Sequence, residues 1–217
     1  MRRRTPEPPP GLPTIQHTPG MANELMRELA PLLAEDGIDI DNIEVDDMQT
    51  LQTALNRAIE RHNTARFTPV GEARAYALTT LRLVVEAIAD GDTDLAAAIL
   101  ESVPPEAPDG KASVAGCIGV ALDLVDNWLG GKDAEAPDGL ARKTRLPAGH
   151  WMGEHAAIDV LALAAKGRAF KSLHTLNVRQ GGLHLLFGSA LAVTAALQTW
   201  ADLTGTSVVT LANQHLR

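Results

Sequence analysis

The stretch "GHWMGEHAAID" at residues 149–159 gathers the side chains with the most evident capacity for chemistry in this chain. If the stretch is helical, His150 and Glu154 lie one turn apart, and so do His155 and Asp159. Imidazole and carboxylate groups at this spacing can ligate a divalent metal or orient one another for proton transfer. The four residues are therefore a candidate metal or acid–base site.

A structural interpretation fits the same stretch. Its two glycines indicate that the helix begins only near Glu154, which leaves His150 in a loop. Glu154 then lies at the positive end of the helix dipole, and His155 pairs with Asp159 on the surface. The sequence has no His-Glu-x-x-His motif, and further ligands would have to come from histidines elsewhere, such as His174 or His184. We favour the structural interpretation and expect no cofactor.

The closing stretch, "ADLTGTSVVTLANQHLR" at residues 201–217, has the spacing of a DNA-binding helix-turn-helix. Ala201 is small where two helices would cross, Gly205 suits a sharp turn, and Leu211 would dock the second helix. Ser207 is a suitable cap for that second helix. The pattern predicts at least a helical hairpin, over residues 197–217.

As a DNA reader, this hairpin would use polar side chains of its second helix. The candidates for nucleic-acid contact are Ser207, Thr210, Asn213, Gln214 and Arg217. The second helix contains no lysine, and position 214, usually apolar in the motif, is glutamine. The net charge of −8 also disfavours contact with phosphates. We favour an ordinary hairpin with a glycine turn and keep DNA binding as the alternative.

Two further charged regions have compositions that suggest ligand binding. The acidic stretch "DGIDIDNIEVDD" fails as a calcium loop, because a loop starting at Asp39 would need glycine and glutamate where Glu44 and Thr50 stand. The span 142–179 holds seven basic residues and two acidic ones. The basic residues are Arg142, Lys143, Arg145, Lys166, Arg168, Lys171 and Arg179. They can bind phosphate, nucleic acid or the chain's own acidic segment, but a solvated surface with some pairing within the chain is the favoured interpretation.

The single cysteine, Cys117, excludes an internal disulfide. It shares an apolar helix face with Ile118 and Val125, and no histidine or cation lies near it in sequence. A buried structural thiol is therefore expected rather than a nucleophile.

Composition favours close-packed helices. Apolar residues make up 45% of the 217 residues, but aromatic residues only 3%, so the core must be built from Ala, Leu, Val and Ile. We predict an all-α protein, a multi-helix bundle of about eight helices built from helical hairpins. The helices are expected at about 22–34, 47–63, 71–90, 93–102, 113–129, 153–166, 168–177, 181–203 and 206–216.

The domain organisation follows from where apolar periodicity begins and stops. Residues 1–20 hold three arginines and six prolines and are expected to be a flexible tail. Met21 resembles a natural start, so the tail is either a basic arm or a segment preceding the true initiator. Residues 21–217 are the helical domain, with a candidate sub-boundary in the polar segment 130–149.

No apolar run reaches the length of a membrane span, since the longest, 183–197, is short and contains His184. With one cysteine and no signal peptide, we expect a cytoplasmic protein. The function favoured is a non-enzymatic helical interaction or regulatory module that binds a protein partner or self-associates. The alternatives are a DNA-binding regulator using residues 197–217 and a metal-dependent enzyme centred on residues 150–159.

Overall fold

The structure, a computed structural model, describes residues 30–35, 37, 48–107 and 110–217. In this part of the chain every regular element is helical, which confirms the predicted all-α class. The expected tail, the acidic loop and most of the helix predicted at 22–34 lie outside the described residues. The chain divides into two compact units, Met1–His62 and Asn63–Arg217, called here the N-terminal and C-terminal units.

The N-terminal unit contains a helical segment at 30–35 and most of helix α2 (Met48–Phe67). Leu33, Ala54 and Ala58 form a small buried apolar cluster within this unit. Helix α2 extends beyond the predicted end at residue 63 and stops before Thr68, whose hydroxyl donates to the carbonyl oxygen of Thr64 at 2.8 Å. The predicted interruption by Thr68 and the following proline is confirmed.

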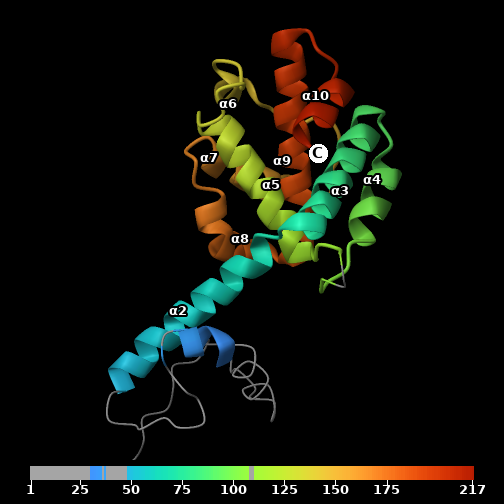
Figure 1. Ribbon diagram of the computed structural model, residues 1–217. Helices are drawn as coiled ribbons and strands as arrows, with labels where there is room; N and C mark the ends of the chain where they lie inside the picture. Colours follow the sequence, from blue (N-terminus) through green and yellow to red (C-terminus); the bar gives the residue numbers. More distant parts are fainter. Residues whose placement is uncertain (1–29, 36, 38–47, 108–109) are drawn as a thin grey trace, which may run out of the picture. The chain divides into compact units, whose positions relative to one another are not determined.

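The C-terminal unit contains the remaining helices (Figure 1). They are α3 (Gly71–Ala89), α4 (Thr93–Glu101), α5 (Val114–Leu129), α6 (Leu140–Lys143), α7 (Glu154–Ala164), α8 (Leu173–Gln180), α9 (Gly182–Thr204) and α10 (Val208–His215). A 3₁₀ turn (Phe170–Ser172) precedes α8. Most predicted boundaries lie within two residues of these, but the helix expected at 168–177 spans Leu173–Gln180, and the short helix α6 was not predicted.

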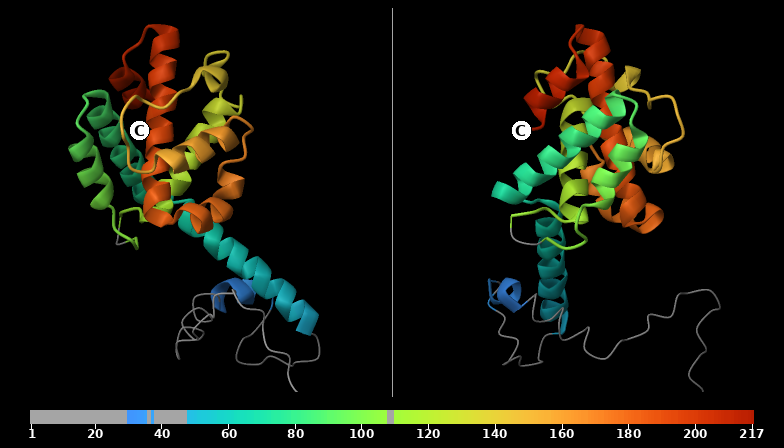
Figure 2. Two further views of the ribbon diagram at one scale, coloured as in Figure 1. Left: turned by 180° about the vertical axis from the view of Figure 1, so that it is seen from behind. Right: turned by 90° about the vertical axis from the view of Figure 1, so that its right-hand side faces the viewer.

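Helix α9 runs through the middle of the C-terminal unit and contacts α3, α5, α7, α8 and α10 (Figures 1 and 2). Every residue from 185 to 197 is buried. Although the sequence suggested no run of spanning length, α9 is long and apolar enough to cross a membrane. Because 78% of its most apolar window is buried within the protein, the helix matches a core helix of a bundle equally well.

Short-range signals set the ends of several helices. Asp92 caps α4 by accepting a hydrogen bond from the Leu95 N–H at 2.9 Å. Ser113 caps α5 through the Gly116 N–H at 3.2 Å. Gly91 has a φ of 78°, which suits the glycine predicted to end α3. At these three helix ends, the terminal geometry is therefore encoded by neighbouring residues.

The polar segment 130–149 connects parts of one core. Helices α5 and α7, on either side of it, both pack against α9. Leu140, in the short helix α6 within the segment, is buried in the same core. The candidate sub-boundary therefore lies inside one compact unit, and the division between units falls within α2 instead.

Helices α7 and α9 approach each other at two glycines. A Cβ atom on Gly188 would lie 2.5 Å from the Ala156 Cβ and 2.7 Å from the Ala157 backbone nitrogen. A Cβ on Gly153 would lie 2.5 Å from the Gly188 nitrogen, and its φ of 78° also favours glycine. This close contact fixes the start of α7 against the first turns of α9.

We predict that Gly188→Ala destabilises the C-terminal unit by about 1–3 kcal/mol, because the added methyl group would collide with the α7 backbone. Gly182→Ala, on the same helix, is the control: its Cβ would meet only the Asn177 Oδ1 at 3.6 Å. Chemical denaturation followed by circular dichroism measures both. Equal free energies of unfolding for the two variants would contradict the close contact.

Candidate functional site

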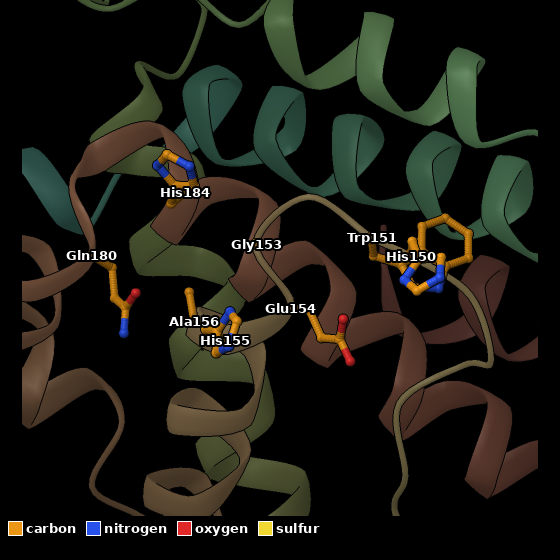
Figure 3. Close-up of a pocket in the computed structure, with 8 residues that line it drawn as sticks. All are labelled: His150, Trp151, Gly153, Glu154, His155, Ala156, Gln180 and His184. Carbon is orange, nitrogen blue, oxygen red and sulfur yellow. The ribbon is translucent and has the colours of Figure 1, made fainter.

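A hollow of about 460 Å³ opens where α7, the end of α8 and the start of α9 meet (Figure 3). It is lined by His150, Trp151, Gly153, Glu154, His155, Ala156, Gln180 and His184. The three histidines are exposed, whereas Glu154 and Gln180 are half-buried. Among the residues that the structure describes, this hollow gathers three of the four residues proposed from sequence as a metal or acid–base site.

The local structure of the hollow follows the structural interpretation of the sequence. Helix α7 begins at Glu154, so His150 lies in the preceding loop. Gly153 is the residue before the helix and provides no side-chain cap. Figure 3 shows His155 and Glu154 on the first turn of α7, with His184 on the neighbouring first turn of α9.

The structure brings together three of the four proposed metal or acid–base residues and separates the fourth. Asp159 does not line the hollow. Its carboxylate instead contacts two side chains of α8. Its Oδ2 accepts a hydrogen bond from the Gln180 Nε2 at 2.7 Å and lies 3.3 Å from the Arg179 Nη1. The expected pairing of His155 with Asp159 is thus replaced by contacts with α8.

The hollow gains two residues that the helical spacing did not select. His184 was noted only as a histidine that tertiary structure would have to supply, and Gln180 was not considered. Within the described part of the chain, no three His, Cys, Asp or Glu side chains are grouped so that they could hold a metal ion. The four-residue metal set is therefore not assembled there.

The C-terminal hairpin forms as its sequence predicts. Gly205 has a φ of 68° and ends α9, and the Ser207 Oγ accepts a hydrogen bond from the Thr210 N–H at 3.1 Å. Leu211 is only 4% exposed and docks α10 together with Leu216. Helix α10 packs against α3 as well as α9.

The five proposed nucleic-acid contacts are all exposed, but most make interactions within the protein. The Ser207 and Thr210 hydroxyl oxygens lie 2.7 Å apart. Asn213 accepts a hydrogen bond from Arg82 at 3.4 Å, and the Arg217 Nε donates to the Gln214 carbonyl at 2.9 Å. Arg217 is the one basic residue among the five, so DNA contact by these residues stays a prediction.

His215, on the other side of α10, is part of an aromatic cluster. Its ring centroid lies 4.5 Å from that of Trp200 and 6.0 Å from that of Trp128. Its Nδ1 is 4.0 Å from a carboxylate oxygen of Glu135, and its side chain is 13% exposed. His215 therefore anchors the terminal helix to α5 and α9.

The basic residues of the span 142–179 also make contacts within the chain. The Arg145 Nη1 donates to the carbonyl oxygens of Arg142 and Thr144, at 2.8 and 2.7 Å. Arg179 is engaged with Asp159, as described above. At least these two side chains help to hold local structure, in agreement with the favoured interpretation of this span.

Asp126 is an anchoring residue that sequence reasoning missed. It is 7% exposed, and its two carboxylate oxygens accept hydrogen bonds from the Ala169 and Phe170 N–H groups at 2.8 and 2.9 Å. These donors open the turn that leads into α8 and have no helical partner of their own. Asp126 thereby ties α5 to the chain that follows α7.

Asp126→Ala is expected to lower the free energy of unfolding by about 2–3 kcal/mol, because two buried backbone donors lose a charged acceptor. Asp123→Ala, one turn earlier in α5, is the matched control. Asp123 is 47% exposed and lies 3.6 Å from Arg74, so its loss should cost less than about 1 kcal/mol. Thermal or urea unfolding of both variants distinguishes them, and a smaller loss for Asp126→Ala would be contrary to this role.

Cys117, on α5, lies in the hydrophobic core and is fully buried. Burial raises the pKa of its thiol to about 12, because the thiolate would be desolvated. Only the thiolate is a strong nucleophile, so the thiol is inert at neutral pH. This agrees with the expected structural role.

The folded protein should react with a thiol reagent such as 5,5′-dithiobis(2-nitrobenzoate) at least about a hundredfold more slowly than the unfolded chain at about pH 8. The raised pKa lowers the thiolate fraction, and burial excludes the reagent. Since the chain has a single cysteine, absorbance reports this residue alone. Equally fast labelling before and after addition of guanidinium would show that the thiol is accessible.

Comparison of the chain with family models, curated proteins and solved structures finds no match. A function is therefore inferred from the positions and contacts of the described residues.

Proposed function

We propose that this protein is a non-enzymatic helical interaction protein that binds a protein partner through exposed apolar side chains of α7, α8 and α9. The observation that carries the proposal is a set of large apolar side chains exposed on these three neighbouring helices. Ile158 on α7 is 52% exposed, Val178 on α8 is 72% exposed and Leu183 on α9 is 48% exposed. We call these three residues the apolar surface.

Burial of exposed apolar side chains provides the driving force for protein association. Removing one such side chain from water contributes about 1.5–3 kcal/mol when burial is complete. Polar groups on the same helices, including Arg179, Asp159 and His155, supply the charged or hydrogen-bonding margin that is typical of an interface. A protein partner with a complementary apolar patch fits this arrangement.

Three of the polar or nucleophilic side chains are engaged in structural contacts or buried, which supports a non-enzymatic role. Asp159 is held by α8, Asp126 caps the turn before α8, and Cys117 is buried with a raised pKa. Each would have to leave a stabilising environment to act as a base, ligand or nucleophile. Binding through the apolar surface requires no such rearrangement.

Site-specific photocrosslinking tests this function in the cells that make the protein. A benzophenone amino acid at position 178 is expected to crosslink a discrete protein. The same group at Val70 is the control, because Val70 is 80% exposed and precedes α3, outside the three helices that carry the apolar surface. A crosslinked species of twice the chain's mass would identify the partner as a second copy.

The double variant Ile158→Ser, Leu183→Ser should abolish the crosslink from position 178 while leaving the circular dichroism spectrum unchanged. The reason is that both substitutions remove exposed apolar area, and neither Ile158 nor Leu183 is among the buried residues of the core. Absence of any crosslink at position 178, or the same products at positions 178 and 70, would refute the apolar surface as the binding site.

A further inference from the structure

The C-terminal unit has a second exposed apolar side chain set among acidic residues. Residues 83–107 include six Asp or Glu and no Lys or Arg. On α4, Asp94 and Glu101 are exposed and lie two turns apart on one side of the helix, and Leu95 beside them is 50% exposed. We call Asp94, Leu95 and Glu101 the acidic surface. Figures 1 and 2 show α4 and α7 on opposite sides of α9.

The apolar surface lies instead in a basic part of the chain. Residues 155–184 contain four basic residues and a single acidic residue, Asp159. The basic residues are Lys166, Arg168, Lys171 and Arg179, and all four are exposed. Arg179 lies 3.3 Å from Asp159, whereas the other three form no ion pair with any residue that the structure describes. These positive charges are therefore available to an acidic partner.

We propose that the partner of the apolar surface is the acidic surface of a second copy of this chain. The inference rests on the proposed function, since it names the occupant of the same surface. Leu95 of one copy packs against the apolar surface of the next, and Asp94 and Glu101 face its basic residues. Because each copy carries both surfaces, the contact is heterologous and joins copies head to tail.

Charge favours this pairing over a symmetric one. Two apolar surfaces placed face to face would bring the same basic residues of both copies together, and like charges in an interface are unfavourable. The acidic surface replaces that repulsion by attraction. Since the whole chain has a net charge of −8, its basic part is also where an approaching copy is least repelled.

Sedimentation velocity of the purified full-length protein tests the assembly. At low salt we expect species larger than a dimer whose share grows with protein concentration, because each pair of copies leaves one surface free at each end. At about 1 M salt, where the Debye length is about 3 Å, association should weaken at least about tenfold. A protein that stays monomeric at every concentration, or that stops at a dimer, would overturn the inference.

Two blocking variants distinguish a head-to-tail contact from a symmetric one. Val178→Glu places a negative charge in the apolar surface, and Leu95→Glu removes the apolar side chain of the acidic surface. Each variant alone should be monomeric, whereas an equimolar mixture should form a 1:1 dimer and nothing larger, because each retains the surface that the other needs. Val209→Glu, at a 41% exposed position on α10, is the control and should assemble like the unmodified protein. Circular dichroism checks that all three variants fold.

The inference is overturned if either blocking variant still assembles, or if the mixture forms no dimer. It is also overturned, with the proposed function intact, if the photocrosslink from position 178 joins a different protein. If position 178 gives no crosslink at all, the proposed function fails, and this inference fails with it.

Discussion

The constraint on which the C-terminal unit depends is the burial of α9 on all sides. A helix with every residue from 185 to 197 buried can exist only if other helices cover its whole circumference. At Gly188 that cover is close enough to exclude a side chain, because the α7 backbone occupies the place of a Cβ atom. The first turns of α7 and α9 are consequently held together, and the polar hollow opens beside this contact.

Sequence reasoning succeeded where the determining interaction is local. The apolar stripe of α3, the Ser207 cap and the Gly205 turn involve residues within about one or two helical turns of one another, so spacing alone locates them. The same reasoning missed Asp126, whose partners are 43 and 44 residues away. It also misplaced the role of Asp159, because nothing near that residue indicates that Gln180, 21 residues later, will bind it.

Six polar residues of the described chain fall into two groups according to what the fold requires of them. Asp126, Asp159 and His215 hold helices or turns in place through hydrogen bonds, an ion pair and ring contacts. His150, His155 and His184 remain exposed around a hollow that the close approach of α7 and α9 creates. Because those three come from a loop and two helices, their grouping depends on tertiary packing, which explains why the sequence suggested His184 only as one histidine among others.

The polar hollow and the apolar surface occupy different residues of the same helices. Ile158 lies one turn beyond Glu154 on α7, and Leu183 directly precedes His184 on α9. Any movement of the first turn of α7 therefore displaces both the hollow and one edge of the apolar surface. Gly188 limits that movement, since α7 is in contact with the α9 backbone there and has no room to approach further.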